Sequence, residues 1–533
     1  MPYYRDLRGY IDELERRELL WRIKTPVNRE TELIPLVRWQ FRGLPEEQRR
    51  AFLFEKVTDV KGKKYDIPVL VGALAASREI YALGMGCKPS EISEKWLDAQ
   101  LHPIPPKLVK SGPAQEEVHY EADLLKEGLD EFPFPVNTPG FGGGLRTTAT
   151  HFFTKDPETG ARNIGNYAGF VHARDRMIIG LHRTQHMATH LLKAKAMRKP
   201  LEAALVVGVL PAYAMVSVAK VAYGEDEVAV ACGLAGEPLE VIKCRTVDIE
   251  VPASSEIVFE GLISTEQMET HMGSFGEYSG YLAEGHPCPL FEIKCITHRR
   301  KPVFTSIISQ FPPSESSKIR QIAYEGNLLK FLKHDCNLPG ILDVAFHESS
   351  GAMQYCVIQM QKNHNSQAWQ ALNATVAYEA AIGKWVIAVD EDIDPHDPDS
   401  VNWALSFRVQ PHRDTRITQG KSAMLDPSTA PPGSPRDEAV YPYPAGASAI
   451  LIDATRKWAY PPVALPKREY MERAKEIWER EGLPALKPRK PWHGYTLGYW
   501  PKRYEEAAQA TLEGEIHKIG EKRAKERTPF KLH

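Results

Sequence analysis

Hydrophobic positions near the N-terminus follow a helical period and then an extended one. Apolar residues share one face of a predicted helix over residues 5–18, and residues 19–23 form a short apolar run typical of a strand. A second strand is predicted at 67–71, where Gly72 ends it, and a helical stretch follows. Helices that alternate with buried strands predict an N-terminal α/β domain over residues 1–120.

The pattern changes at about residue 147, where the apolar residues come in short β-rich runs separated by turn residues. These runs recur between residues 203 and 307. Many short strands at close spacing are typical of a β-barrel or a β-sandwich. We therefore expect a central β-barrel domain over residues 121–315, entered through a proline- and glycine-rich loop at 132–144.

The helical period returns after this region. Apolar runs at 355–360 and 385–389 predict the buried strands of a C-terminal α/β domain over residues 316–460. The acidic stretch 390–399 predicts a solvated loop.

Residues 461–533 are helical, charged and interrupted by prolines, with few apolar residues to fill a core of their own. A tail of this kind usually packs on a neighbouring subunit or remains mobile.

Composition restricts the class of protein. A chain of 533 residues exceeds one ordinary core, and its formal net charge of −2 provides no field to attract nucleic acid or an anionic membrane. No apolar run reaches the roughly 18 residues that span a bilayer, and the first residues lack the apolar segment of a secretory signal. The seven cysteines are scattered and form no CxxC pair. This favours reduced thiols in a cytoplasmic protein over a disulfide framework or a thiolate zinc site.

A glycine cluster at residues 140–145 (GFGGGL) begins like a dinucleotide-binding fingerprint. Leu145 stands where the third glycine is required, and the cluster follows a proline-rich loop rather than a strand. The pattern therefore argues against a Rossmann site.

Three histidines, His182, His186 and His190, share one face of a predicted helix and could bind zinc. No glutamate follows His182 as in the HExxH pattern, so the general base of a zinc protease is missing. A zinc hydrolase built on these residues remains one hypothesis. In another, one of the imidazoles joins a site with mixed ligands.

A succession of motifs in the middle of the chain is more specific. The segment 163–168 (NIGNYA) is followed by Gln185-His186, by Glu227 in the run EVAVACG, and by Glu277 in the run SFGEYSGY. In this order and spacing the motifs resemble the UbiD family of decarboxylases. The resemblance extends over most of the chain.

The resemblance implies a cofactor and metal ions. In UbiD-like enzymes an Asn, a His and a Glu bind a divalent metal that bridges to the phosphate of prenylated FMN, and the matching residues are Asn163, His186 and Glu227. An amide oxygen, an imidazole and a carboxylate suit Mn²⁺, with Fe²⁺ or Mg²⁺ as alternatives. The family also places K⁺ beside this site, near Glu227 and residues 216–219. The residues that the resemblance assigns to cofactor binding are Asn163, Ile164, Gly165, Asn166, Tyr167, Ala168, Gln185, His186 and Ser217.

Glu277 matches the family's catalytic acid. The implied reaction is the reversible, non-oxidative decarboxylation of an aromatic or α,β-unsaturated carboxylic acid. Loss of CO₂ leaves carbanion character on the former carboxyl carbon, so a proton donor must stand beside it. A glutamate between Phe275 and Tyr278 can remain protonated in an apolar pocket. The resemblance further implies a barrel similar to that of flavin reductases, a dimer or hexamer, and a UbiX-like flavin prenyltransferase that supplies the cofactor.

Two positions depart from the family pattern. Many members have an Arg five residues after the metal-binding Asn and a Glu five residues before the catalytic acid, where this chain has Ala168 and Met272. The change removes a bidentate clamp for a carboxylate. Possible replacements are His172, Arg174 and His271.

Two hypotheses explain these departures. The substrate is oriented by other contacts, as for an aroyl-CoA thioester such as phthaloyl-CoA, whose phosphates the basic residues Lys487, Arg489 and Lys490 could bind. Alternatively, the chain is a noncatalytic subunit of a carboxylase complex. Retention of the metal-binding trio and of Glu277 favours the first hypothesis.

Overall fold

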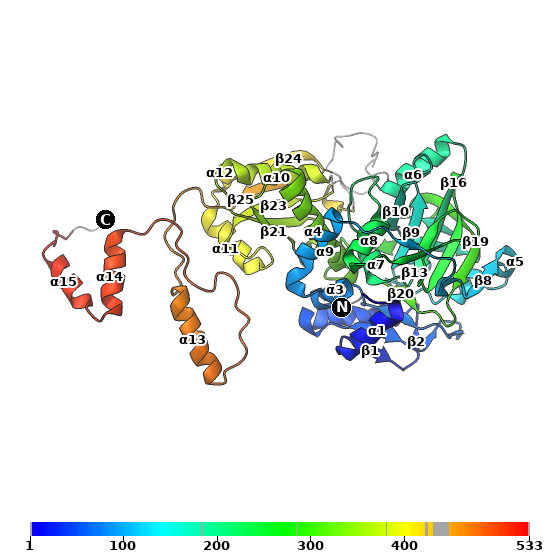
Figure 1. Ribbon diagram of the computed structural model, residues 1–533, viewed down its shortest axis with the longest axis horizontal. Coiled ribbons are helices and arrows are strands. Elements are labelled where there is room, and N and C mark those ends of the chain that lie inside the picture. Colours follow the sequence, from blue (N-terminus) through cyan, green and yellow to red (C-terminus); the bar gives the residue numbers. More distant parts are fainter. Residues whose placement is uncertain are drawn as a thin grey trace.

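The body of the protein is built from mixed sheets packed with helices, and the residues after about 460 extend from it as an arm (Figure 1). Among the described residues no helix is long and apolar enough to cross a membrane. The computed structural model describes residues 3–182, 185–283, 285–379, 381–421, 425–429 and 447–530.

The N-terminal part contains a four-stranded sheet whose last strand comes from far along the chain. Its order is β1-β3-β6-β20, formed by Leu20–Ile23, Ala51–Phe54, Val69–Val71 and Phe304–Ser306. Helix α1 (Leu7–Arg16) buries the apolar face that the sequence predicts, and the Asp6 carboxylate caps it by accepting the Gly9 N–H. Because β20 completes this sheet, the N-terminal part depends on residues from the centre of the chain.

The remaining N-terminal elements include a small sheet and four α-helices, of which α4 packs on α8 (Glu227–Ala235) and α9 (Glu315–Lys330), and α5 packs on β8 (Glu117–Tyr120) and β19 (Pro287–His298). Strands β2, β4 and β5 form a small sheet from Val27–Asn28, Val57–Thr58 and Lys64–Tyr65. Helices α2 to α5 are Leu33–Gly43, Arg78–Met85, Ile92–Leu101 and Glu121–Leu124.

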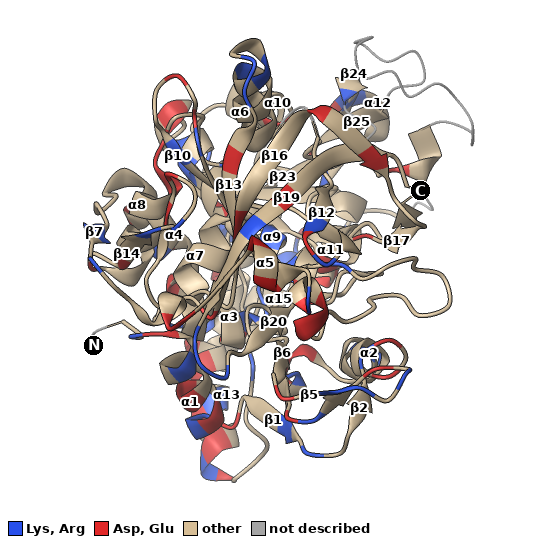
Figure 2. Cartoon of the chain, turned by 90° about the vertical axis from the view of Figure 1, so that its right-hand side faces the viewer, with Lys and Arg blue, Asp and Glu red and all other residues tan. Residues whose placement is uncertain are grey.

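The largest sheet forms the centre of the molecule, and its long strands β16 and β19 are visible in Figure 2. Its order is β10-β9-β13-β16-β19-β12-β11, and β8 also pairs with β19. Within the described ranges no strand pairing joins β10 to β11 at the two ends of this order, so the predicted central β-barrel is not confirmed. Strands β8 to β13, β16 and β19 are Glu117–Tyr120, Thr150–Lys155, Arg162–Asn166, Gly169–Ala173, Arg176–Ile179, Leu201–Val207, Ile257–Thr270 and Pro287–His298.

Helices α6 (His186–Ala196), α7 (Pro211–Val216) and α8 (Glu227–Ala235) pack against β9 and β10 of this sheet. Asp226 caps α8 by accepting two N–H groups of its first turn, so the helix begins at Glu227. Two smaller sheets lie beside them, β7-β14-β15 and β17-β18. Their strands are Lys107–Leu108, Glu240–Lys243, Glu250–Pro252, Phe275–Gly276 and Leu282–Ala283.

The C-terminal part is a five-stranded sheet of order β21-β22-β23-β25-β24, with helices around it. Both strands that the sequence predicts here are present, as β22 and β23. Strands β21 to β25 are Ile341–Phe346, Tyr355–Met360, Trp385–Asp390, Thr415–Lys421 and Ala447–Asp453. Helices α9 to α12 are Glu315–Lys330, Ser366–Tyr378, Pro398–Arg408 and Pro411–Asp414.

The prediction of a solvated acidic loop at 390–399 is wrong at its start. Asp390 and Asp392 are buried, and both bind the buried guanidinium of Arg408, at 2.9 and 2.6 Å. Burial of two carboxylates is tolerable here because one arginine pairs with both.

The tail contributes helices α13 (Arg468–Arg480), α14 (Lys502–Leu512) and α15 (Ile516–Ala524), in which no residue is buried. Large apolar side chains nevertheless stand exposed along them. On α13 these are Tyr470, Ile477 and Trp478, which share one helical face.

Candidate cofactor and active site

Strand β10 and the turn after it position the predicted segment 163–168. Asn163 is buried opposite Thr154 of β9, and Ile164 packs into the core. The Tyr167 ring lies over the backbone of Gly165, so closely that a Cβ added there would be 2.2 to 2.3 Å from three atoms of the ring. Glycine is therefore required at this position by space rather than by backbone conformation.

His186 and Glu227 meet at the start of two helices. His186 is the first residue of α6 and Glu227 the first of α8, and the His186 Nδ1 and Glu227 Oε1 atoms are 3.2 Å apart. Glu227 is buried, which raises the pKa of its carboxyl, with the bond to His186 opposing the shift. Because α6 and α8 both pack on β10, this pair lies beside the strand that carries Asn163.

Two buried polar atoms of this group have no hydrogen-bond partner. They are Asn163 Nδ2 and Glu227 Oε2. Unpaired buried polar atoms are rare and costly, and an amide can equally present its oxygen on that side. An amide oxygen, a carboxylate oxygen and an imidazole nitrogen are a fitting donor set for a divalent cation such as Mn²⁺. His186 and Glu227 thus meet beside the strand that carries Asn163, and Asn163 and Glu227 each have a buried atom without a hydrogen-bond partner.

Ser217 adjoins the same turn from helix α7. Its backbone carbonyl accepts the Asn166 N–H at 2.9 Å, and its hydroxyl donates to the Ala214 carbonyl at 2.7 Å. The Ser217 oxygen is also 2.8 Å from Nδ1 of the buried His151. Burial lowers the pKa of His151 to about 3, so the imidazole is neutral. Ser217 is therefore held in place from three sides.

Gln185 precedes α6 and turns back toward the loop before it. Its Oε1 accepts the His182 N–H at 2.8 Å, and it makes no side-chain cap bond to the helix. Asn166 is fixed on the other side, where its Nδ2 donates to the Thr148 carbonyl at 3.1 Å.

Glu277 follows strand β17 and lies between buried aromatic residues, as predicted. Its side chain is 17% exposed, while Phe275 and Tyr278 are both buried. Its N–H donates to the Tyr281 carbonyl at 3.1 Å, which holds the turn between β17 and β18. The carboxylate therefore stands at a partly open edge of an apolar environment.

Sequence reasoning missed Arg146, which among the cations of the described residues lies closest to Glu277. Arg146 is buried; its Nη2 donates to the Gly276 carbonyl at 2.6 Å, and its Nη1 is 4.0 Å from Glu277 Oε1. Its guanidinium lies near the rings of Phe170 and Phe275, at 6.0 and 5.2 Å. Nothing in the local sequence distinguishes this arginine from a surface one, because its burial depends on strands distant in the chain.

The two departures from the family pattern lie near this arginine. Ala168 packs against the buried cluster that includes Phe170 and Phe275. Met272 is exposed, and its methyl group lies beside Gly144.

Of the three replacements considered, one lies beside the aromatic pair that surrounds Arg146. The His271 ring stacks on Phe275 at 5.0 Å and meets Phe170 edge-on at 3.9 Å. His172 instead contacts Glu269 at 2.6 Å. Arg174 pairs with Asp130 at 2.8 Å and is largely exposed.

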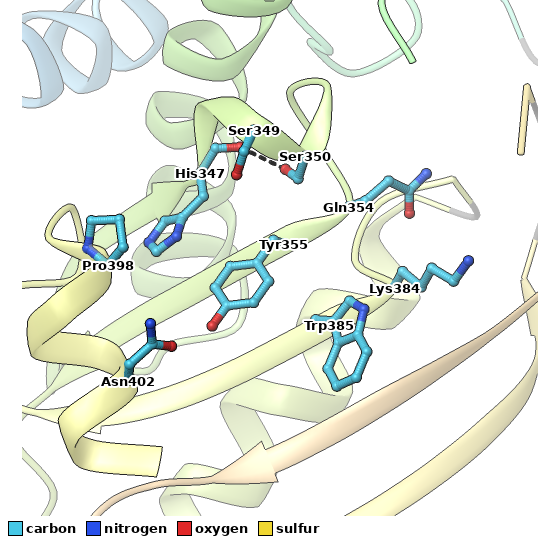
Figure 3. A pocket seen from close by; sticks show the side chains of 9 residues that line it. All are labelled: His347, Ser349, Ser350, Gln354, Tyr355, Lys384, Trp385, Pro398 and Asn402. Atoms are coloured by element: carbon cyan, nitrogen blue, oxygen red, sulfur yellow. Dashed lines mark hydrogen bonds between the residues drawn. The ribbon is translucent and has the colours of Figure 1, made fainter. Parts of the chain in front are cut away.

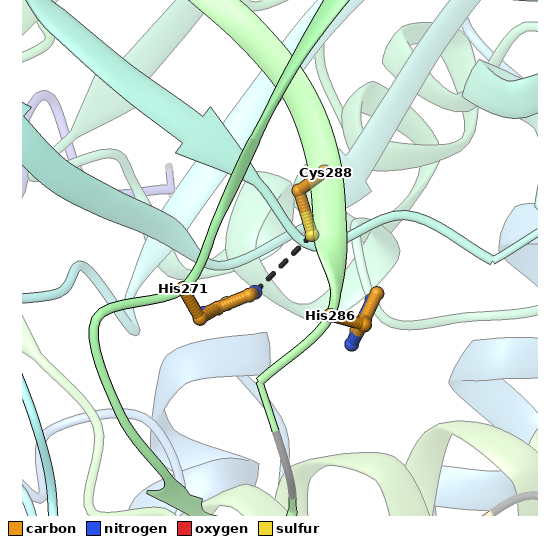
Figure 4. A group of neighbouring side chains, drawn as sticks. All are labelled: His271, His286 and Cys288. Atoms are coloured by element: carbon orange, nitrogen blue, oxygen red, sulfur yellow. Dashed lines mark hydrogen bonds between the residues drawn. The ribbon is translucent and has the colours of Figure 1, made fainter.

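His271 also belongs to a compact group with His286 and Cys288 (Figure 4). His271 Nε2 is 3.2 Å from Cys288 Sγ, and one donor atom from each of the three side chains lies within 4.8 Å of the others. Burial lowers the pKa of His271 to about 4 and raises that of the Cys288 thiol to about 12. The imidazole is therefore neutral and the thiol protonated, and a metal would first have to displace that proton.

The structure does not bring His182, His186 and His190 together as one metal site. His186 pairs with Glu227, whereas His190 is buried with its Nδ1 3.0 Å from the Thr154 hydroxyl. In the described part of the chain, neither group of three His, Cys, Asp or Glu side chains that could share an ion includes any of these histidines.

An open hollow of about 430 Å³ lies in the C-terminal part and contains none of the predicted site residues (Figure 3). Its wall includes His347 stacked on Tyr355 at 4.6 Å. The lining residues are His347, Ser349, Ser350, Gln354, Tyr355, Lys384, Trp385, Pro398 and Asn402.

Comparison with known families matches three consecutive parts of the chain. Residues 11–100, 107–312 and 319–454 match the N-terminal, Rift-related and C-terminal domains of 3-octaprenyl-4-hydroxybenzoate carboxy-lyase. An uncharacterized protein of Archaeoglobus fulgidus is 30% identical over 484 residues, which cover 85% of this chain and 92% of that protein.

Solved structures agree with this match. The UbiD-class enzyme HmfF from Pelotomaculum thermopropionicum in complex with FMN is 32% identical, with a TM-score of 0.73 over 86% of this chain and 95% of its own. An evolved dimeric form of HmfF in complex with prFMN is 30% identical, with a TM-score of 0.72 over 87% and 97%. Vanillic acid decarboxylase of Sedimentibacter hydroxybenzoicus in its closed form is 26% identical, with a TM-score of 0.77 over 90% and 100%.

The fold and these matches define an enzyme of the carboxy-lyase class. Within that class, the chain belongs to the UbiD family of decarboxylases.

Proposed function

We propose that this protein catalyses the reversible, non-oxidative decarboxylation of an aromatic or α,β-unsaturated carboxylic acid with prenylated FMN. The observation that carries the proposal is the 3.2 Å contact of His186 with Glu227 beside the strand of Asn163, with one unpartnered buried atom on Asn163 and one on Glu227. HmfF, a structural relative, is known in complex with prFMN and with FMN. We therefore infer that this site binds the same cofactor.

In this proposal Asn163, His186 and Glu227, which we call the metal corner, hold the cofactor, and Glu277 supplies the proton. Asn163, His186 and Glu227 would hold a divalent cation, and its charge would offset that of the buried Glu227 and favour an anionic cofactor. A K⁺ ion beside Glu227 would balance the negative charge of Glu227 and the cofactor's phosphate that the divalent cation leaves uncompensated. The bound flavin supplies the electron sink for the loss of CO₂. Glu277 then donates its proton to the carbon that has lost the carboxylate.

Apolar side chains around Glu277 support an apolar acid as the substrate. Phe141, Met272, Tyr281 and Phe311 are all exposed. They belong to one region, because residues 142 and 274 form a bridge, and the Phe311 ring lies 3.0 Å from the Cβ position of Gly280. Exposed aromatic groups that lie together are typical of a surface that receives an apolar ligand.

A free acid fits these observations better than a CoA thioester held by the basic tail segment. Lys487 lies 3.6 Å from Glu47, and Arg489 lies 3.4 Å from Asp399. Both cations thus have carboxylate partners. A substrate panel of a benzoic acid, a cinnamic-type acid and an aroyl-CoA, assayed for CO₂ release, separates the possibilities.

The proposal is tested with protein coexpressed with a UbiX-like flavin prenyltransferase and purified without oxygen. We expect bound prenylated FMN by mass spectrometry and one divalent metal per chain. Glu277→Gln should abolish turnover while both remain bound, and Glu227→Gln should lose both. Glu292→Gln, an exposed carboxylate on β19, is the matched control with unchanged content and turnover. Absence of prenylated FMN from the wild type would contradict the proposal.

The same experiment decides between an enzyme and a noncatalytic subunit of a carboxylase complex. Activity of the purified chain without a second polypeptide excludes the subunit hypothesis. Binding of the cofactor without any activity would favour it.

We also propose a cytoplasmic homo-oligomer, a dimer or hexamer, assembled through residues 461–533. The exposed apolar face of α13 and the lack of buried residues in the three tail helices support this assembly. Seven cysteines without a disulfide agree with a reducing compartment. We retain the division into parts 1–120, 121–315, 316–460 and 461–533 as a proposal.

A further inference from the structure

Arg146 differs from the other buried arginines of the described chain. Arg29, Arg49 and Arg408 each have a carboxylate oxygen within 3.2 Å. Among the described residues the carboxylate nearest to Arg146 is 4.0 Å away, on Glu277. Its one direct hydrogen bond uses Nη2, so Nε and Nη1 remain available to another acceptor.

A buried guanidinium without a close anion is costly, because the charge has lost its water and gained little in return. Burial accordingly lowers the pKa of Arg146, and Glu277 opposes the shift only in part. An arginine nonetheless stays charged at neutral pH. The site therefore favours an anionic ligand that completes the guanidinium's bonding.

The position of Arg146 identifies where that anion would bind. Arg146 pairs with Phe170 across a backbone bridge, and its guanidinium shares the environment of Phe170 and Phe275. The small side chain of Ala168 packs against the buried cluster to which these two rings belong. Arg146 and Glu277 thus present a fixed cation and a proton donor on one apolar wall.

We propose that Arg146 binds the carboxylate of the substrate acid and holds it beside Glu277. The inference rests on the proposed function and names the group of this chain that recognises the substrate's charge. Guanidinium and carboxylate match in a planar, two-bond geometry, which fixes orientation as well as charge.

The arrangement also fits the later steps of the reaction. The C–C bond to the carboxylate breaks, its electron pair stays with the substrate carbon and CO₂ leaves, so Arg146 loses its bound anion. Glu277 gives its proton to the carbon and becomes a carboxylate. Arg146 then has a new anion 4.0 Å away, which stabilises the ionised Glu277.

The test compares ligands of one shape that differ in charge. Benzoate and benzamide are titrated into the wild-type holoenzyme, Arg146→Lys and Arg146→Gln, with binding measured by calorimetry and turnover by CO₂ release. We expect the wild type to prefer benzoate and Arg146→Gln to bind benzoate about tenfold to a hundredfold more weakly, with little change for benzamide. The KM for the acid should rise by a similar factor. Arg146→Lys, which keeps the charge without the planar fork, should fall between the two.

Arg174→Gln is the control for loss of one positive charge, because Arg174 is exposed and pairs with Asp130. It should bind both ligands as the wild type does. Equal binding of benzoate and benzamide by the wild type overturns the inference, as does an equal loss of both in the Arg146 variants. If Arg146→Gln does not fold, Arg146→Lys decides by the same comparison. Failure of the proposed function is recognised separately, because the wild type would then lack prenylated FMN and turnover while the charge preference in binding remains.

Discussion

Replacement of Gly165 with alanine tests whether the space under Tyr167 holds the metal-binding segment in place. An alanine Cβ would lie 2.2 to 2.3 Å from three atoms of the Tyr167 ring, where normal contact needs about 3.5 Å. The ring is buried and packs 6.0 Å from that of Phe152. It must therefore move by about 1 Å, and the turn that follows Asn163 must move with it.

The expected loss of stability follows from this overlap. Overpacking a core position costs about 1–3 kcal/mol, and the lower chain entropy of alanine returns about 0.4–1 kcal/mol. Gly165 is not among the glycines with positive φ, so no backbone strain is added. A net loss of about 1–2 kcal/mol corresponds to a fall in Tm of about 2–8 °C for a domain of this size.

Thermal unfolding and metal content are measured together. We expect Gly165→Ala to lose metal and cofactor more severely than it loses stability, because the displaced ring adjoins Asn163. Gly43→Ala is the matched control, since a Cβ at the end of α2 meets nothing within 4 Å. A Gly165→Ala protein with wild-type Tm and metal content would refute the steric reasoning.

Three further predictions concern pH, a buried ion cluster and the tail. Burial lowers the pKa of His151 from 6.5 to about 3, so stability that is present above pH 6.5 is lost as the pH falls toward 3, by about 5 kcal/mol in full. In His151→Gln the Tm should therefore fall less steeply between pH 6.5 and 4 than in the wild type. An unchanged slope of Tm against pH would contradict this prediction. Asp392→Asn should lower the free energy of unfolding of the C-terminal part by about 3–5 kcal/mol in denaturant, because it leaves the buried Arg408 with less negative charge. Glu391 is a more exposed partner of Arg456, so Glu391→Gln should change the free energy of unfolding by less than about 1 kcal/mol. Equal effects of the two substitutions would contradict the burial argument. Serine at Tyr470, Ile477 and Trp478 should reduce the mass measured by light scattering while cofactor content is kept, and an unchanged mass would exclude this face of α13 as a subunit contact.

Local elements of this fold could be predicted where the pattern is periodic. Helix α1 and strands β22 and β23 follow apolar spacing, and the structure contains them. The partner of β6 could not be predicted, because β20 is three residues long and its pairing depends on chain geometry between distant positions. Likewise, buried Asp390 gives the same local pattern as a solvated acid, and only Arg408 from a later helix distinguishes the two.

The candidate site shows the same limit. Glu227 alone would be interpreted as an exposed charge beside a turn, and only its order among the other motifs identified it; the structure shows it buried against His186. Arg146 belongs to no sequence motif that could have identified it. Its importance follows from burial and from the distances to Gly276 and Glu277, which are properties of the folded chain alone.

One short segment connects the two halves of the site. Residues 163–166 lie in β10 beside His186 and Glu227, and Phe170 in β11 lies beside Arg146. A hydrogen bond from Asn166 to Thr148 and one from Gly169 to Thr147 tie this segment to the residues between Arg146 and strand β9. The metal corner and the pair formed by Arg146 and Glu277 are therefore positioned by the same two segments, residues 163–170 and residues 146–148. A change that moves this segment should disturb cofactor retention and substrate recognition together, whereas Arg146→Gln should disturb recognition alone.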